Sequence, residues 1–153
     1  MNSITPEQQL DSFIDKFLPE IASTTRDAIG KMRLLLPGAL ELVYDNYNAL
    51  AIGYSPTEKT SEVIFSIAVY PKWVSLFFMQ ASGMVDPDGL LKGSGKIVKH
   101  TVLEESGDID SAAVRALMAS ALVVAKVPLD LSLPYRLIIK SISEKQRPRR
   151  PSK

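Results

Sequence analysis

The sequence has no cysteine, and it has only one histidine and one tryptophan. The absence of thiols excludes disulfide frameworks, zinc–thiolate sites, iron–sulfur ligation and a cysteine nucleophile. A single histidine cannot form an HExxH pair, and there is no GxSxG nucleophile elbow. No catalytic mechanism can be assigned from these residues, so we predict a non-enzymatic protein.

Long apolar runs are also missing. No run reaches the roughly 18 residues of a membrane span. The first residues, MNSITPEQQLDSF, lack the basic segment and apolar core of a secretory signal. The chain has 153 residues, of which 46% are hydrophobic and 23% charged, a typical globular composition. We therefore expect a soluble, cytoplasmic protein with one domain over residues 1–143.

The net charge is only +1, but it is unevenly distributed. From Glu144 onward one acid faces five basic residues, namely Lys145, Arg147, Arg149, Arg150 and Lys153. This Pro- and Arg-rich composition predicts a disordered tail over residues 144–153. Such a tail can bind nucleic acid or acidic lipid weakly through charge, or it can simply be solvated. The remaining body carries an acidic excess, which does not favour nucleic-acid binding.

The hydrophobic pattern predicts two helices, a run of strands and a third helix. Thr5-Pro6 and Pro19 mark helix starts, and Asp110 or Ser111 can cap the last helix. Strands are expected at residues 39–46, 48–54, 63–70, 73–80, 96–103 and 135–142. Short connections favour antiparallel pairing. We therefore predict a two-layer α+β fold. Its antiparallel sheet has five to six strands, and two N-terminal helices and one C-terminal helix pack on it.

Four stretches resemble the YdhG-like family, a domain of unknown function. They read LDSFIDKFLPEI, VYDNYNALAIGY, VIFSIAVYPKWVSLFFMQ and, over 86–122, DPDGLLKGSGKIVKHTVLEESGDIDSAAVRALMASAL. The resemblance covers roughly residues 8–125. Some members of the family are described as frataxin-like intracellular iron chaperones, so the resemblance implies a binding module with iron as its possible cargo.

One candidate site is acidic. Glu7, Asp11 and Asp15 are four residues apart, so they share one stripe of the first helix. Exposed carboxylates can hold Fe²⁺, Mn²⁺ or Ca²⁺ weakly, and the resemblance implies an acidic iron-binding surface as well. The same spacing is also typical of a solvated helix face, which the helix dipole favours near the N-terminus.

A second group of residues could hold a small ligand or an anion. Tyr44, Tyr47 and Tyr54, with Asn46 between the first two, cluster around the first strand pair and can line a pocket or pair across strands. The GSGK turn offers backbone N–H groups and lysines to an anion, or it is simply a turn that needs glycine. Its residues are Lys92, Gly93, Gly95 and Lys96. His100 can be a ligand or a packed core residue.

These observations lead to three hypotheses. The first is a YdhG-like binding domain with weak iron-chaperone character. The second is a small-ligand or anion-binding domain that uses the tyrosines and the GSGK turn. The third is a protein-interaction module, such as a homodimer formed through a sheet edge or an exposed helix face.

Overall fold

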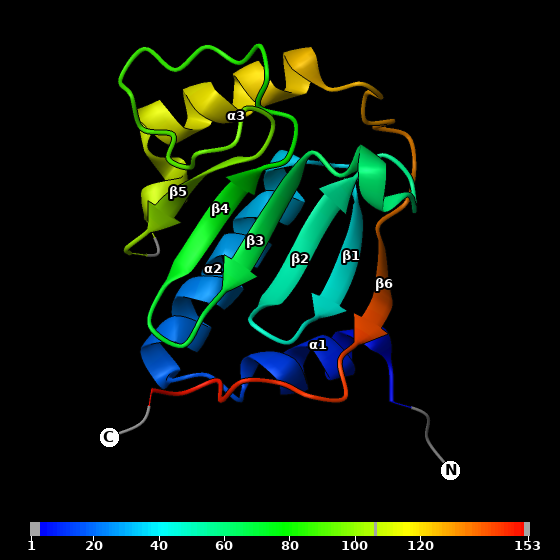
Figure 1. The fold of residues 1–153 in the computed structure, drawn as a ribbon. Coiled ribbons are helices and arrows are strands. Elements are labelled where there is room, and N and C mark those ends of the chain that lie inside the picture. The colour runs from blue at the N-terminus through cyan, green and yellow to red at the C-terminus, as the bar shows by residue number, and fades with distance from the viewer. Residues whose placement is uncertain (1–3, 106, 152–153) are drawn as a thin grey trace.

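The computed structural model describes residues 4–105 and 107–151. Its helices are α1 (Pro6–Ile14), α2 (Pro19–Leu35) and α3 (Ala112–Val124), with short 3-10 turns η1 (Thr60–Glu62) and η2 (Asp108–Asp110). Its strands are β1 (Leu40–Asp45), β2 (Leu50–Ser55), β3 (Phe65–Val69), β4 (Val74–Phe78), β5 (Lys99–Leu103) and β6 (Arg136–Ile142). In Figure 1, α2 lies behind the sheet, α1 below it and α3 across its upper end. The predicted α+β class is confirmed.

Local sequence signals explain where the helices begin and end. The Thr5 hydroxyl accepts from the Gln8 N–H at 3.1 Å, and the Gln8 side chain accepts from the Thr5 N–H at 2.9 Å. This capping box, followed by Pro6, starts α1. Gly38 follows α2 with a φ of +85°, and a Cβ there would collide with the Asp130 carbonyl. Only glycine fits that close approach.

The strand order is β5-β4-β3-β2-β1-β6, with β1 to β5 paired antiparallel. One detail of the prediction is wrong, because β6 pairs with β1 in parallel and the sheet is mixed. Both β1 and β6 follow a helix that ends at the upper end of the sheet, so both strands run downward (Figure 1). A parallel pair needs such a long crossover connection.

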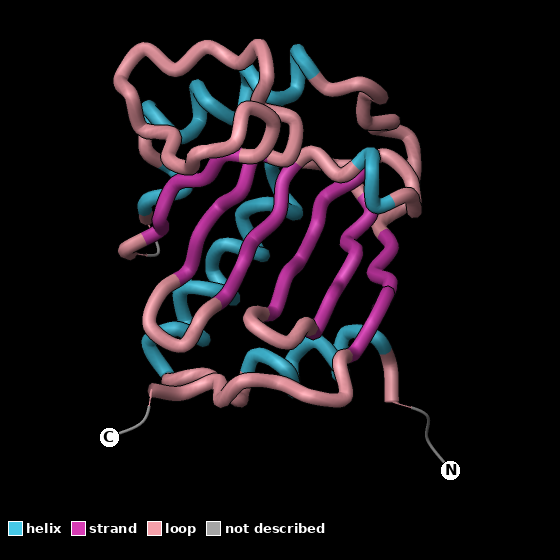
Figure 2. Tube along the Cα trace, viewed as in Figure 1, coloured by secondary structure: helices cyan, strands magenta, loops and turns pink. Residues whose placement is uncertain are grey.

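The main core lies between the helices and one face of the sheet. Residues of that face alternate with those of the other, and they include the fully buried Ile52, Ile67 and Leu76. Figure 2 shows helices behind the strands and none over the middle of the front face. We call this front face the open face. None of the described helices is long and apolar enough to cross a membrane.

The C-terminal segment differs from the prediction of a disordered tail. Residues 143–151, which we call the strap, run below the sheet and along α1 (Figure 1). The Arg149 side chain is only 4% exposed, and its Nη2 lies 2.8 Å from Asp45 Oδ1 and 2.6 Å from the Asn46 carbonyl. A buried ion pair therefore orders a segment whose composition is typical of disorder. Residues 152–153 of the predicted tail lie outside the described part.

Candidate functional site

The three carboxylates of the predicted metal stripe each pair with an arginine. Arg33 Nη2 lies 2.7 Å from Glu7 Oε1. Arg26 Nη2 bridges Asp11 and Asp15 at 2.7 and 2.6 Å. The side chains link α1 to α2, with guanidinium groups where a cation would bind. Among the described residues there is no group of three or more His, Cys, Asp or Glu side chains that could hold a metal ion.

Glu7 also belongs to a polar network that the sequence did not reveal. Its centre is Glu41, whose side chain is 1% exposed. The guanidinium of Arg33 contacts both Glu41 oxygens through Nε at 3.0 Å, and the Tyr54 hydroxyl donates to Oε2 at 2.8 Å. The Tyr135 hydroxyl contacts Glu41 Oε1 at 2.6 Å and also Glu7. The network joins α1, α2, β1, β2 and the residue before β6.

The environment of the network favours the protonated forms of its three donors, Tyr54, Tyr135 and Arg33. Burial, and then the Glu41 carboxylate, raise the pKa of Tyr54 well above its usual value. Burial and hydrogen bonds to Glu41 and Glu7 likewise raise the pKa of Tyr135. Burial lowers the pKa of Arg33, but the hydrogen bond and charge of Glu41 raise it by more. The donors thus stay neutral tyrosines and a charged arginine, which suits a structural role.

The predicted tyrosine cluster is split by the sheet. Tyr54 pairs with Glu41 in register and faces the helices, whereas Tyr44 pairs with Ala51 and lies on the open face. The Tyr44 hydroxyl is 2.7 Å from Thr60 Oγ1. Tyr47 lies in the β1–β2 turn and is 48% exposed. Tyr47 and the adjacent Asn46 both line a hollow on the open face.

The GSGK residues form a connection that leads into β5. The main chain of Lys92 exchanges hydrogen bonds with that of His100 at 2.7 and 2.9 Å, and Gly93 has a φ of +121°. Lys99 Nζ donates to the Gly93 carbonyl at 2.9 Å. Gly95 and Lys96 are exposed farther along the same connection. The structure therefore gives Gly93 a conformational role, as a turn requires.

His100 lies on β5 opposite Phe77. The two rings are stacked, with centroids 4.9 Å apart and an interplanar angle of 26°. Phe77 lines the same hollow as Asn46 and Tyr47. Of the predicted ligand-binding residues, the structure therefore brings Tyr44, Asn46, Tyr47 and His100 to the open face, and it separates Tyr54 from them.

The floor of this hollow is made of small side chains. Across the sheet, Ala51 of β2 pairs with Ala68 of β3, and Ala68 pairs with Ser75 of β4. In the next row Ser66 pairs with Gly53, which is covered by the Val63 side chain, since a Cβ at Gly53 would lie 3.1 Å from Val63 Cγ1. Strands usually carry branched or aromatic side chains at such positions, because these fill the pleated surface. Here Ala51, Ser66 and Ala68 line the hollow, whereas Ser75 is 1% exposed and lies outside its lining.

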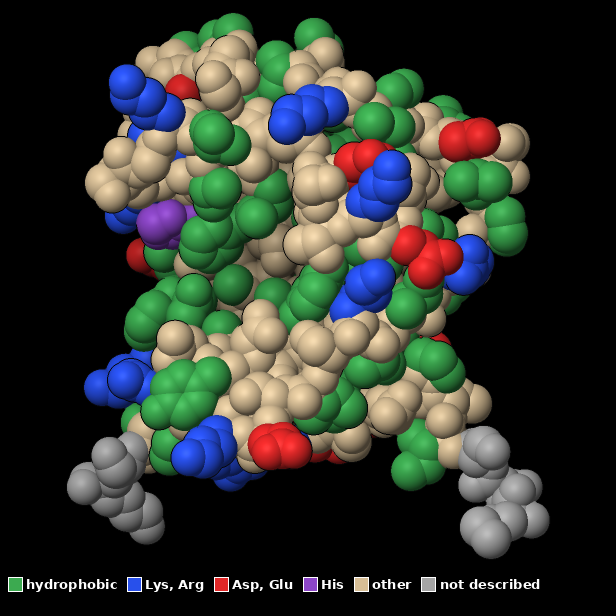
Figure 3. All heavy atoms as spheres, turned by 45° about the vertical axis from the view of Figure 1, so that its right-hand side comes forward, with side chains coloured by type: hydrophobic (Ala, Val, Ile, Leu, Met, Phe, Trp, Pro, Cys, Tyr) green, Lys and Arg blue, Asp and Glu red, His purple; other side chains and the backbone are tan. Residues whose placement is uncertain are grey.

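Aromatic and apolar side chains wall the space. The hollow has a volume of about 650 Å³, and Tyr47, Tyr70, Phe77, Met79 and Val98 stand around its floor. Asn46, Asn48 and Ser143 add polar groups at the rim. In Figure 3 the middle of this side of the molecule is recessed between its upper and lower parts. Apolar walls with a few polar groups are typical of small-molecule sites.

Two strands of the sequence carry a signal for this floor. In LAIGYS and FSIAV, large apolar residues alternate with alanine, glycine or serine. A period of two with large residues on one face and small residues on the other predicts an open face that is hollow, not filled.

No family model, curated protein or solved structure matches the chain. The resemblance to the YdhG-like family therefore stays a prediction, as does the iron-chaperone role that it implies.

Proposed function

We propose that the protein is a non-enzymatic binding protein that holds a flat, largely apolar small molecule in the hollow of the open face. The observation that carries this proposal is the floor of small side chains, in register on neighbouring strands. A planar ligand would lie on Ala51 and Ala68, in the space that larger side chains would otherwise fill. The rings of Tyr47, Tyr70 and Phe77 would contact it from the sides.

The energetics of the sheet support a binding role for this surface. Alanine, glycine and serine contribute less to strand stability than branched residues, so the floor is not optimised for the stability of the free protein. Covering the floor removes apolar surface from water and gains about 25 cal/mol per Å². The walls belong to strands and to tight turns, so little conformational freedom is lost on binding.

The decisive experiment fills the hollow with larger side chains introduced at its floor. Titration with the neutral fluorescent probe N-phenylnaphthylamine measures binding of a flat apolar molecule. Ala68→Leu, alone and with Ala51→Leu, places side chains where the ligand would lie. We expect affinity for the probe to fall at least about tenfold with no loss of thermal stability. Ala116→Leu, on the exposed face of α3, is the matched control and should bind like the wild type.

Two results would overturn the proposal. The wild-type protein could fail to bind the probe and the members of a small-metabolite panel alike. Alternatively, the filled variants could bind as tightly as Ala116→Leu. Light scattering on the same samples shows whether a second copy of the chain occupies the face, in which case the filled variants would change the molar mass instead.

A further inference from the structure

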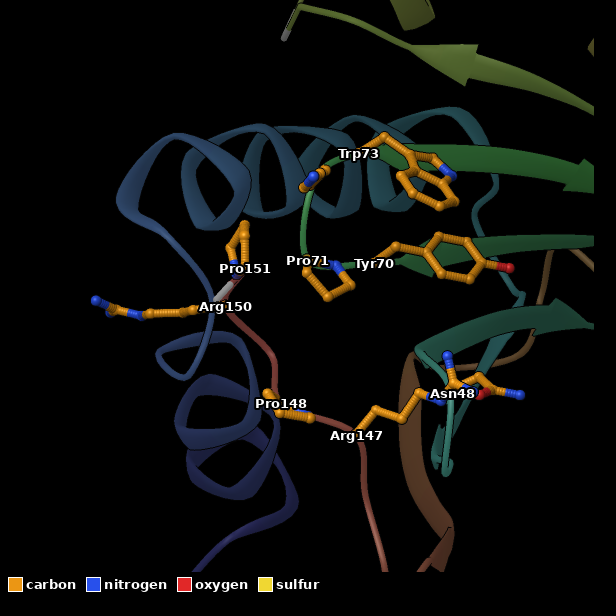
Figure 4. Close-up of a pocket in the computed structure, with 9 residues that line it drawn as sticks. Asn48, Tyr70, Pro71, Trp73, Arg147, Pro148, Arg150 and Pro151 are labelled. Atoms are coloured by element: carbon orange, nitrogen blue, oxygen red, sulfur yellow. The ribbon is translucent and has the colours of Figure 1, made fainter. Parts of the chain in front are cut away.

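A second cavity lies at the lower end of the sheet, next to the hollow, with which it shares Asn48 and Tyr70. It has a volume of about 790 Å³ and lies between the β3–β4 turn, the β1–β2 turn and the strap. Figure 4 shows Tyr70, Pro71 and Trp73 on one side of it and the strap residues Arg147 and Pro148 on the other, with the Tyr70 and Trp73 rings one above the other and pointing along the strands. Its lining contains Lys72, Arg147 and Arg150 and no acidic residue. The cavity is therefore both aromatic and positively charged.

Two of the three cations at this cavity, Lys72 and Arg147, form no ion pair among the described residues, although Lys72 also lines a neighbouring pocket with Glu20 and Glu104. Elsewhere arginines bind carboxylates, as Arg26, Arg33 and Arg149 do. Within the described chain, neither Lys72 nor Arg147 has a carboxylate within ion-pair distance. The Arg147 guanidinium lies 5.6 Å from the centroid of the Tyr47 ring, and its backbone N–H donates to the Tyr47 carbonyl at 2.9 Å. The strap thus fixes the position of Arg147 and leaves its charge for an external anion.

The aromatic pair is rigid and accessible. Tyr70 and Trp73 flank the two-residue Pro71-Lys72 turn, and the Tyr70 N–H donates to the Trp73 carbonyl at 2.9 Å. Their rings stack with centroids 4.5 Å apart and planes 19° apart. Trp73 is 45% exposed, a large apolar ring held in water. A nucleobase can stack on such a ring whatever its identity, because every base has an aromatic face.

We propose that this cavity binds nucleoside phosphates, with the base against the Tyr70–Trp73 pair and the phosphate between Lys72 and Arg147. Neither half of the site suffices alone, since an aromatic pair does not select an anion and two cations do not select a ring. The same chemistry is offered by a free nucleotide and by a single strand of nucleic acid. The inference goes beyond the proposed function, and the hollow need not be occupied for it to hold.

Trp73 is the only tryptophan in the chain, so its fluorescence reports on this cavity directly. We would titrate the full-length protein with AMP, adenosine, inorganic phosphate and a short oligouridylate. We expect saturable quenching by AMP, with adenosine and phosphate each at least about tenfold weaker. Binding by the oligouridylate tighter than by AMP would identify a single strand as the ligand, and the reverse order would identify a free nucleotide.

Variants separate a site from general attraction to charge. Lys72→Ala/Arg147→Ala should weaken AMP binding at least about tenfold. Lys96→Ala/Lys145→Ala removes the same charge outside the cavity and should leave it unchanged. Equal losses in both pairs, or no binding of AMP and oligouridylate by the wild type, would overturn the proposal. Binding of N-phenylnaphthylamine should survive Lys72→Ala, which removes a cation of this cavity that does not line the hollow, so failure here is distinguishable from failure of the hollow.

Discussion

At the scale of single residues, Glu41 shows how a buried charge is made tolerable. It lies on the same face of β1 as the buried Val43, where a period of two predicts an apolar side chain. Arg33 and the hydroxyls of Tyr54 and Tyr135 satisfy it from three other segments. An unpaired carboxylate at this depth would be strongly destabilising. Its partners lie on three other segments, and Tyr135 is 94 residues away, so the network could not be predicted from the strand pattern around Glu41.

Removing one hydrogen-bond donor from Glu41 should show how much the stability depends on these contacts. Tyr54→Phe keeps the ring but leaves Glu41 Oε2 without its 2.8 Å hydrogen bond from the tyrosine hydroxyl. We expect the free energy of unfolding at neutral pH to fall by about 1–3 kcal/mol. Urea denaturation measures the change. Tyr47→Phe, on the exposed β1–β2 turn, is the control and should change stability by less than about 0.5 kcal/mol.

The same variant predicts a pH effect. The pKa of Tyr54 is raised in the folded protein, whereas an unfolded tyrosine ionises near pH 10. The folded state therefore binds the proton more tightly, so this contribution to stability is complete below about pH 10 and is lost as the pH rises above it. Stability should fall less steeply above pH 10 in Tyr54→Phe than in the wild type. Parallel declines in the two proteins would refute the assignment.

At the scale of elements, local sequence signals predicted the helix starts correctly, whereas contacts between residues far apart in the sequence were not predicted. Thr5-Pro6, Pro19 and Ser111 start their helices where the sequence places them, because caps and prolines act within one turn. The strap failed as a prediction because its order depends on Asp45, which is 104 residues from Arg149. Similarly, Tyr44 and Tyr54 could not be assigned to faces without the register of β1 on β2.

The strap should contribute measurably to stability through Arg149. Arg149→Ala removes the guanidinium group. Among the described residues, the buried Asp45 carboxylate then keeps only Lys16 as a cationic partner, with its Nζ 3.9 Å away. Breaking a buried pair in this way costs about 3–5 kcal/mol. We expect a loss in this range by urea denaturation. Arg150→Ala, the exposed neighbour, should cost less than about 0.5 kcal/mol.

A double variant tests whether the pair itself is responsible. Asp45→Asn/Arg149→Leu removes both charges, so it should be more stable than Arg149→Ala. The single variants Asp45→Asn and Arg149→Leu complete the comparison. If the double variant loses as much free energy of unfolding as these two lose together, the strap is held by its backbone hydrogen bonds and not by this ion pair.

At the scale of the whole molecule, the two faces of the sheet have different tasks. The helices cover one face and bury the main core, whereas the other face holds a smaller buried cluster of Leu40, Leu42 and Val63 and the small residues that line the hollow. Variants of Ala51 and Ala68 can therefore change binding without removing contacts of either cluster. The α+β class followed from the order of helices and strands. The parallel direction of β6 did not, because it depends on the end of the sheet at which α3 finishes.

That topology predicts the order of folding. The strands β1 to β4 follow one another through the connections 46–49, 56–64 and 70–73, whereas β6 must close a loop from residue 40 to residue 136. Closing a long loop costs conformational entropy before its contacts form, so β6 should dock after the antiparallel strands have paired. Ile67→Ala in β3 and Ile139→Ala in β6 remove the same atoms from the two regions. We expect Ile67→Ala to slow folding and Ile139→Ala mainly to speed unfolding.

Folding and unfolding rates across a urea series give the φ value of each variant. Ile139→Ala should have a φ of roughly 0–0.3 and Ile67→Ala a clearly larger one, about 0.5–0.8. The comparison is matched in chemistry, but Ile139 is only half-buried, so the φ values and not the raw rates are compared. A φ for Ile139→Ala as large as that of Ile67→Ala would place the β1–β6 pair in the folding nucleus. The parallel strand would then organise the sheet instead of completing it, and loop closure would not set the order of assembly.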